Sequence, residues 1–307
     1  MPRAVVFAYH NVGVRCLSVL LAQGVEVPLV VTHEDSPNET IWFDSVATLA
    51  KRHGIATIAP ADPNVATVFQ RLRALRPEFF FSFYYRHMLG ADLLAIPTRG
   101  ALNMHGSLLP KYRGRVPVNW AIVHGEAATG ATLHEMVAKP DAGRLVDQLA
   151  VPILPNDTAH EVFGKVTVAA EIVLSRALAS IVDGTVRPLT PDLQSGSYFG
   201  GRKPADGRID WSKDAWTVHN LVRAVAPPYP GAFAELHGRR LAILQTWWQD
   251  ERSTTTGAPI LFVRDHRIAL RCNDGGLLDV LRAEVDGHPL TPDSFSNLFG
   301  SQEIPLP

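Results

Sequence analysis

The amino-acid sequence predicts an α/β fold: a Rossmann-like, mostly parallel sheet with helices on both faces, followed by a small OB-like β-barrel domain. Short apolar runs alternate with segments of helical periodicity in the first part of the chain, as in parallel sheets with crossover helices. Further on, short strand-like runs are separated by Gly and Asp turns, which is typical of a barrel. We therefore predict a Rossmann-like domain at 1–190, a linker at 191–205 and an OB-like domain at 206–307.

The elements follow from apolar periodicity and turn residues. In the first domain we predict strands at 4–8, 25–32, 55–58, 78–83, 100–102, 129–137 and 145–153, a loop at 9–13, and helices at 14–22, 42–53, 65–75, 116–123 and 157–182. After the linker we predict a helix at 215–225 and strands at 232–236, 240–248, 259–263, 268–272 and 276–282.

Composition excludes several classes of protein. The 307 residues carry a formal net charge of −1, which argues against a large nucleic-acid footprint. Only two cysteines are present and no apolar run reaches membrane-spanning length, so we expect a reduced, cytoplasmic protein without a membrane span. The first strand is followed by Gly13 alone and not by G-x-G-x-x-G, so NAD is not expected. The sequence has no H-E-x-x-H and no C-x-x-C, so no metal is expected either.

The segment 103–115 concentrates the polar chemistry, and Pro110 and Gly114 predict that it is a loop leaving the sheet. Asn103 and His105 are two residues apart, so in an extended chain they share a face. An amide and an imidazole facing one space can stabilise an oxyanion and move a proton, which suits acyl transfer to an amine. We expect Asp141, in a second loop, to meet His105, fix its tautomer and raise its pKa.

Other interpretations of these residues stay open at this point. Ser107 is a candidate nucleophile, but it lacks the G-x-S-x-G elbow of the hydrolases. An Asn-x-His pair also caps turns, and Asp141 before Ala and Gly also suits a turn. The cations of the segment equally suit a solvated loop: Lys111, Arg113 and Arg115.

Two segments together carry a family resemblance. Asn103-Met104-His105-Gly106-Ser107-Leu108-Leu109-Pro110-Lys111-Tyr112-Arg113-Gly114 and Lys139-Pro140-Asp141-Ala142-Gly143 resemble the signature of the formyltransferases that use 10-formyltetrahydrofolate. The similarity continues at 209–211 and 223–233. The chain is thereby identified as a member of this family of N-formyltransferases, and the resemblance covers nearly its whole length.

A narrower resemblance concerns the acceptor. Four segments are similar to the formyltransferase domain of the bifunctional polymyxin-resistance proteins: 7–10, 32–35, 81–87 and 199–204. That domain formylates UDP-4-amino-4-deoxy-L-arabinose, a nucleotide sugar used in lipid A biosynthesis. It is joined there to an NAD-dependent decarboxylase half, whereas this sequence stops at Pro307, so we expect a stand-alone formyltransferase or that part of a longer protein.

The resemblance implies roles for particular residues. Asn103 would stabilise the oxyanion of a tetrahedral intermediate, His105 would act as general acid and base, and Asp141 would keep the pKa of His105 high. The 10-formyltetrahydrofolate cosubstrate would bind along His87, Met88, Leu89, Arg115, Val137, Ala138, Lys139, Pro140 and Asp141. Tyr9, His10 and Asn11, after the first strand, together with Arg202 and Lys203, are the candidates for binding the nucleotide sugar.

Three other functions compete with nucleotide-sugar formylation. A methionyl-tRNA formyltransferase would share the catalytic residues, but the segment 206–307 holds 10 Lys and Arg against 13 Asp and Glu, which disfavours tRNA. A formyltetrahydrofolate hydrolase would use water as the acceptor. A non-catalytic regulator is disfavoured because Asn103, His105 and Asp141 are all present. We expect small-molecule partners and no nucleic acid, and leave open a homo-oligomer.

Overall fold

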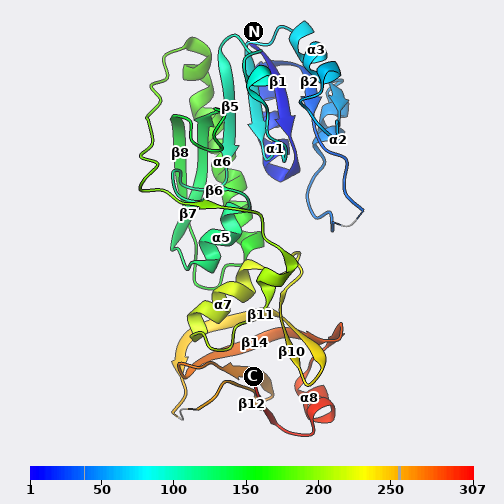
Figure 1. Cartoon of the computed structure of the whole chain (residues 1–307), viewed down its shortest axis with the longest axis vertical. Coiled ribbons are helices and arrows are strands. Elements are labelled where there is room, and N and C mark those ends of the chain that lie inside the picture. The colour runs from blue at the N-terminus through cyan, green and yellow to red at the C-terminus, as the bar shows by residue number, and fades with distance from the viewer. Residues whose placement is uncertain (38, 255–256) are drawn as a thin grey trace. The chain divides into compact units, whose positions relative to one another are not determined.

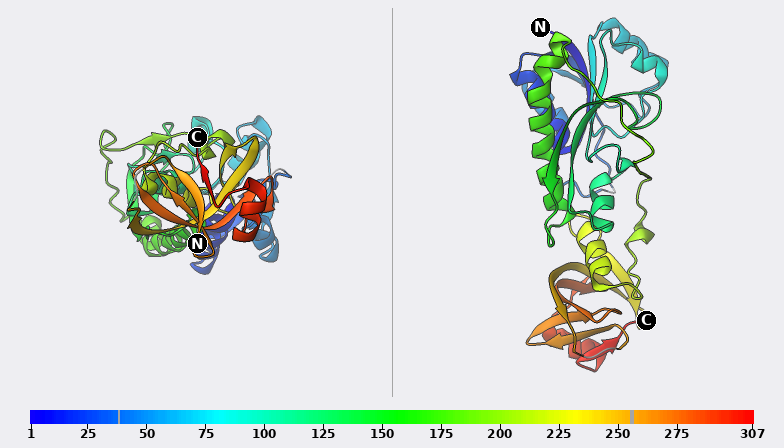
Figure 2. Two further views of the ribbon diagram at one scale, coloured as in Figure 1. Left: turned by 90° about the horizontal axis from the view of Figure 1, so that it is seen from below. Right: turned by 90° about the vertical axis from the view of Figure 1, so that its left-hand side faces the viewer.

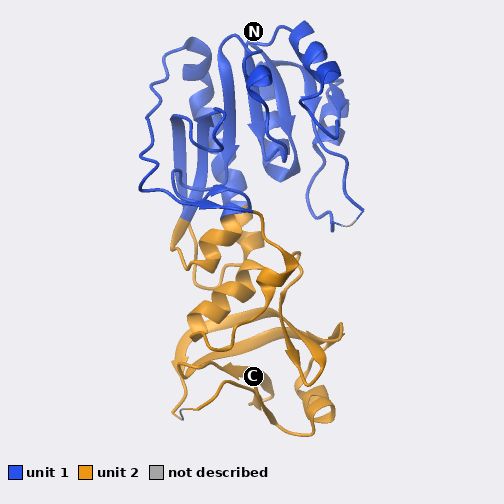
Figure 3. Ribbon diagram, in the orientation of Figure 1, with its two compact units in different colours: residues 1–117, 129–151, 164–200 blue, residues 118–128, 152–163, 201–307 orange. Residues whose placement is uncertain are grey.

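The protein was analysed as a computed structural model that describes residues 1–37, 39–254 and 257–307. Its chain divides into two compact units, which interleave along the sequence (Figure 3). Unit 1 comprises 1–117, 129–151 and 164–200, and unit 2 comprises 118–128, 152–163 and 201–307. The sequence-based boundaries at 190 and 206 stay a prediction.

Unit 1 is built on a seven-stranded sheet in the order β3-β2-β1-β4-β5-β7-β8 (Figure 1). Its strands are β1 (Arg3–Ala8), β2 (Glu26–Val31), β3 (Ala56–Ile58), β4 (Phe79–Phe83), β5 (Gly100–His105), β7 (Ala128–Glu135) and β8 (Leu145–Pro152). The strands from β3 to β5 run parallel, and β7 runs antiparallel to β5. The strand order reverses beside β1, as in doubly wound folds, so the predicted fold class is confirmed.

Helices cover both faces of this sheet. They are α1 (His10–Ala22), α2 (Val46–Arg52), α3 (Ala66–Ala74), α4 (Ala91–Leu94) and α6 (Ala159–Asp183). Val5 and Phe7 of β1 share a core cluster with residues of α3 and α4. The opposite face is covered by α1, whose Gly13 permits close packing because a Cβ there would lie 3.1 Å from the Cβ of Ala8. The long α6 runs along the sheet and joins α1 through Arg15 and Glu171 (Figure 2).

Three predicted boundaries in unit 1 are wrong. The first helix begins at His10 and not at residue 14, so the predicted loop at 9–13 is mostly the first turns of α1. The second helix begins at Val46 and not at residue 42, because the Ser45 side chain accepts from the Thr48 N–H and caps it there. The fifth strand continues to His105, where a loop was predicted.

Unit 2 contains a second, antiparallel sheet of seven strands, which curls into a small barrel-like domain as predicted (Figure 2). Its strands are β10 (Ala232–Leu236), β11 (Arg239–Arg252), β12 (Ile260–Arg264), β13 (Arg267–Arg271), β14 (Gly276–Val285), β15 (His288–Pro289) and β16 (Glu303–Pro305). The long β11 has register shifts between Ile243 and Thr246, and such bulges increase the curvature of a sheet. Phe295 and Leu270 are fully buried in the core beneath these strands.

The remaining elements are short except for one helix against the barrel. They are α5 (Pro117–Val123), the 3-10 helix η1 (Pro204–Gly207), α7 (Ala215–Ala224) and α8 (Pro292–Phe299), with β6 (Arg113–Gly114) and β9 (Tyr198–Phe199) forming a two-stranded sheet in unit 1. The sequence analysis did not predict α8 or β16. Among the described residues, no helix has the length and apolar character needed to cross a membrane.

Candidate active site

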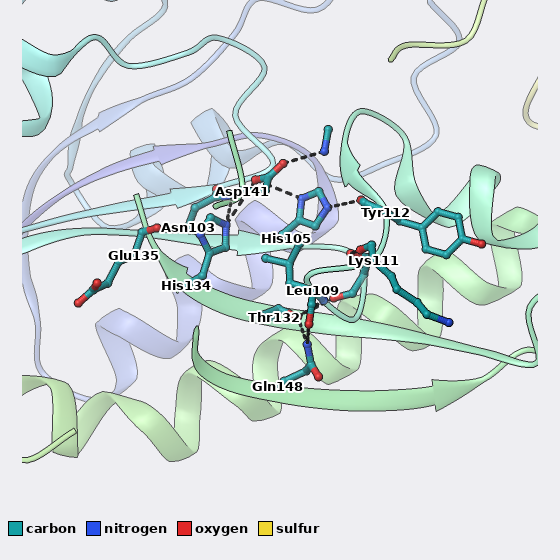
Figure 4. Close-up of polar contacts among 12 residues, drawn as sticks. Asn103, His105, Leu109, Lys111, Tyr112, Thr132, His134, Glu135, Asp141 and Gln148 are labelled. Carbon is teal, nitrogen blue, oxygen red and sulfur yellow. Dashed lines mark hydrogen bonds and ion pairs between the residues drawn. The ribbon is translucent and has the colours of Figure 1, made fainter. Parts of the chain in front are cut away.

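Asn103 and His105 lie in the last three residues of β5, and not in a loop as predicted. Their spacing within a strand places both side chains on one face, as the sequence implied. The neighbouring β7 pairs Asn103 with His134, so a second imidazole comes from the adjacent strand. Figure 4 shows these three side chains gathered around Asp141. Sheet pairing therefore fixes the relative positions of an amide and two imidazoles.

The chain after β5 is held in place by buried and partly buried hydrogen bonds. The Ser107 hydroxyl donates to the Lys111 carbonyl, and the Thr132 hydroxyl of β7 donates to the Ser107 carbonyl. The Gln148 amide of β8 donates to the Leu109 carbonyl (Figure 4). Since Ser107 is fully buried and its hydroxyl is already engaged, its position does not favour the nucleophile alternative.

Asp141 reaches the two histidines from the segment between β7 and β8. One carboxylate oxygen lies 3.6 Å from His105 Nδ1 and 3.4 Å from His134 Nε2. The other accepts the backbone N–H of Gly114 at 2.8 Å. The backbone of Asp141 is left-handed, with φ of 49°, which is uncommon for a residue with a side chain. The two polar segments that the sequence singled out thus meet at this carboxylate.

The tautomer of each imidazole follows from its carbonyl partner, because a carbonyl can only accept. His105 Nε2 lies 2.8 Å from the Tyr112 carbonyl and therefore carries the proton in the neutral ring. Its Nδ1 is left facing Asp141. His134 Nδ1 lies 2.8 Å from the Glu135 carbonyl, so the neutral ring presents Nε2 as an acceptor to the Asn103 amide N–H at 3.1 Å. His134 thereby orients the amide of Asn103.

Burial controls the protonation of this cluster. Burial lowers the pKa of His105, and this outweighs the opposite effect of Asp141 and of the Tyr112 carbonyl. The expected net rise of the His105 pKa is therefore wrong in sign, although Asp141 acts in the expected direction. Burial raises the pKa of the Asp141 carboxyl, but His105, His134 and the Gly114 N–H together lower it below its ordinary range. At neutral pH the cluster holds a neutral His105 beside an ionised Asp141.

The other predicted binding residues are spread over loops of unit 1. His87 and Met88 are exposed and Leu89 is buried, in the segment after β4. In the segment after β7, three of the predicted residues are exposed: Val137, Ala138 and Lys139. Arg115 is exposed and directly follows Gly114, whose N–H binds Asp141. Residues 137–139 are therefore within a few positions of Asp141 and Arg115 is next to a residue that binds it, whereas residues 87–89 follow β4, the strand that pairs with β5.

The candidates for the nucleotide sugar fall in both units. In unit 1, His10 is buried, has a left-handed φ of 67° and stacks on Phe43 at 3.9 Å, and the Tyr9 hydroxyl donates to Asp35. Asn11 accepts the Asp44 N–H. In unit 2, the Arg202 guanidinium lies over the Trp120 ring at 4.8 Å, and burial lowers its pKa. The Lys203 N–H is held by the Asp206 carboxylate, also in unit 2.

The sequence analysis missed His134. It lies on the same face of the predicted strand as Thr132 and Met136. A histidine on a strand of alternating pattern was the one feature of the sequence that could have marked it as a site residue. What the sequence could not show is the pairing of Asn103 with His134, since register between strands depends on the whole sheet.

Solved structures of related fold include the following three. An N-formyltransferase from Helicobacter canadensis, in complex with folinic acid and dTDP-3-aminofucose, matches with a TM-score of 0.74 and 20% identity, over 91% of this chain and 99% of that one. WlaRD, a sugar 3N-formyl transferase in the presence of dTDP and 5-N-formyl-THF, matches with a TM-score of 0.72 and 19% identity, over 91% and 97%. HypX from Aquifex aeolicus, in complex with tetrahydrofolic acid, matches with a TM-score of 0.65 and 19% identity, over 99% and 49%.

Family profiles match the sequence itself. Residues 16–178 match the family described as formyl transferase, and residues 202–300 match the formyl transferase C-terminal domain. These matches span more than half of the chain and confirm the family and the enzyme class predicted from sequence. The protein thus belongs to the formyl transferase family.

Proposed function

We propose that the protein transfers a formyl group from 10-formyltetrahydrofolate to the 4-amine of a nucleotide-linked amino sugar, with UDP-4-amino-4-deoxy-L-arabinose as the first candidate. One observation carries the proposal: Asn103 and His105 project from one face of β5, with the Asp141 carboxylate 3.6 Å from the imidazole. The structures of similar fold that hold a folate derivative together with a dTDP-sugar or dTDP support the two classes of substrate, a folate donor and a nucleotide-linked amino sugar. The choice of the UDP-linked 4-amino sugar is based on the sequence resemblance.

The chemistry divides between the substrates and these three side chains. The donor supplies a formyl carbon that the neutral amine of the sugar attacks directly. Negative charge then develops on the formyl oxygen, where the free N–H of the Asn103 amide is a suitable donor. The amine gives up one proton and the folate nitrogen gains one as the carbon–nitrogen bond to the donor breaks, so the protons balance. His105, next to ionised Asp141, can hold that proton between the two events.

The exposed apolar side chains beside the cluster fit a flat donor. Leu89 after β4 belongs to a buried core cluster, and Met136 after β7 packs against the same cluster. Their chain neighbours Met88 and Val137 are instead exposed. Met88 is 54% exposed and Val137 is 43% exposed. Covering such side chains with a pteridine ring removes apolar surface from water. Both belong to the segments that sequence resemblance assigns to the folate.

The test is to incubate the protein with 10-formyltetrahydrofolate and separate amino-sugar nucleotides, and to detect the N-formyl product by mass. The panel pairs UDP-4-amino-4-deoxy-L-arabinose with dTDP-3-amino and dTDP-4-amino sugars. We expect product with the UDP sugar. Product only with a dTDP sugar would move the assignment to another acceptor. Formate release without any amine, or formylation of methionyl-tRNA alone, would overturn the proposal.

A further inference from the structure

The side chain of Arg113 is largely buried, yet its guanidinium has no partner among the described residues. The residue is 8% exposed, and its backbone N–H donates to the Ser197 carbonyl where β6 meets β9. Its Nε is buried and has no hydrogen-bond partner. Across residues 1–37, 39–254 and 257–307, we find no carboxylate or carbonyl that binds its guanidinium. The two terminal nitrogens are not among the buried atoms without a partner, so they reach solvent.

A buried arginine in unit 2 shows what a satisfied guanidinium looks like in this protein. Arg223 is 3% exposed, and its Nε donates to Asn220. Its Nη1 donates to the carbonyls of Leu154 and Asp157. A buried donor that lacks such a partner is destabilising. The Nε of Arg113 is such a donor, while its terminal nitrogens face solvent, which suggests that a ligand supplies its partner.

In the chain, Arg113 stands between two residues whose backbone groups bind the active-site cluster. The residue before it, Tyr112, offers the carbonyl that binds His105, and the residue after it, Gly114, donates its N–H to Asp141. The segment 103–125 contains no Asp or Glu. Asp141, the acid that reaches this segment, is already held by Gly114 and lies beside two histidines. The protein therefore supplies no local anion for Arg113.

We infer that Arg113 binds an anionic oxygen group of a substrate, a phosphate or a carboxylate, through its terminal nitrogens. A guanidinium presents its donors as a planar fork that matches both groups. This inference rests on the proposed function, under which the anion comes from one of two sources. It is the diphosphate of the nucleotide sugar or a carboxylate of the folate's glutamate.

The experiment measures binding to the full chain by calorimetry, with each ligand alone. The ligands are UDP, uridine and 5-formyltetrahydrofolate. The variants are Arg113→Gln, Arg113→Lys and the control Arg71→Gln, which removes an exposed cation of α3. Because a hydrogen bond to a charged group contributes more than a neutral one, we expect Arg113→Gln to weaken one anionic ligand by about 10- to 100-fold. Arg113→Lys restores part of this, and Arg71→Gln changes nothing.

The pattern of loss identifies the source of the anion. Weaker UDP binding with unchanged folate binding assigns Arg113 to the diphosphate, and the reverse assigns it to the folate carboxylate. If the wild type binds both ligands and Arg113→Gln binds both equally well, the inference is overturned while the proposed function stands. If the wild type binds neither, both are overturned.

A stability measurement separates binding from a structural role. We expect Arg113→Met to raise the melting temperature of the ligand-free protein, because it removes a buried N–H donor that has no partner. We also expect a smaller upward shift of melting temperature on adding the ligand that Arg113 binds. A lower melting temperature of the ligand-free variant, with an unchanged ligand-induced shift, would show that Arg113 serves the fold and not a substrate.

Discussion

Each compact unit contains a cluster of buried polar side chains, and the two clusters are built differently. In unit 2, His219 has a partner at both nitrogens, the Thr246 hydroxyl at 2.7 Å and the Pro155 carbonyl at 2.9 Å. In unit 1, His105 has one such partner, the Tyr112 carbonyl at 2.8 Å, while its other nitrogen faces the Asp141 carboxylate at 3.6 Å. Both ring nitrogens of His219 thus have hydrogen-bond partners, whereas only one ring nitrogen of His105 does.

The backbone conformation near the two clusters also differs. Four residues in or next to the site of unit 1 have left-handed φ values despite their side chains: Tyr84, Tyr112, Val116 and Asp141. In α7 of unit 2, which carries His219 and Arg223, no residue has a positive φ among those described. Strained backbone and unsatisfied polar atoms persist where function requires them. The comparison therefore supports the proposal that the cluster in unit 1, and not the one in unit 2, binds a substrate.

The largest expected effect is catalytic and falls on unit 1. We expect Asn103→Ala and His105→Ala each to lower kcat by about 100- to 1000-fold, equivalent to about 2.7–4 kcal/mol of barrier, the usual result of removing one oxyanion donor. Steady-state kinetics with saturating donor and amino sugar measure the change. Urea unfolding should show little loss of stability, because neither side chain is fully satisfied in the ligand-free protein. Turnover close to that of the wild type in either variant would refute the assigned roles.

Much of this site could be predicted from sequence, because its chemistry is carried by residues close together in the chain. The spacing of Asn103 and His105 implied a shared face whether the segment was strand or loop. Pro110 and Gly114 favoured a loop, and the structure places that loop just after His105. The pKa of His105 could not be predicted, because it depends on burial by residues distant in sequence. His134 could not be predicted either, because its position beside Asn103 depends on how β5 and β7 pair.

The next effect is on stability, and falls on unit 2. Burial lowers the pKa of His219 to about 4 from an ordinary 6.5. As pH falls below 6.5, the unfolded chain takes up a proton that the folded protein refuses, so stability decreases between pH 6.5 and pH 4 and is unaffected above 6.5. The free energy of unfolding is thereby lower at pH 4 than above pH 6.5 by roughly 3 kcal/mol. Urea unfolding at pH 7.5 and pH 4 should show a smaller decrease for His219→Gln than for the wild type.

Each protein serves as its own reference in that experiment, so any constant cost of the substitution cancels. An equal decrease in the free energy of unfolding of the two proteins would mean that His219 is protonated in the folded state at pH 4. The hydrogen bonds of His219 in unit 2 would then not hold it in the neutral form. His105→Gln provides the matched measurement in unit 1. Burial also lowers the pKa of His105, so we expect the substitution to change the pH dependence of stability in the same direction.

The fold was predictable where periodicity is strong and less so at the ends of elements. The buried strands of the first sheet and the strands β10 to β14 were predicted within a few residues. The start of α1 was missed because His10 enters the helix with a left-handed backbone, which no propensity favours. The helix α8 was missed although Thr291 caps it and Pro292 opens it, because the eight-residue segment contains only Phe295 as a buried residue. Tertiary contacts decide such short elements.

The smallest effect tests how unit 1 orients Asn103. His134 Nε2 accepts from the Asn103 amide at 3.1 Å, and its Nδ1 is held by the Glu135 carbonyl. We expect His134→Leu, which removes the acceptor, to lower kcat by about 10-fold, the value of one hydrogen bond of about 1.4 kcal/mol, with little change in KM. His134→Gln keeps an acceptor and should recover part of the rate. If Leu and Gln lower kcat equally, the volume of the side chain matters and not its hydrogen bond, and Asn103 is then oriented by other contacts of β5.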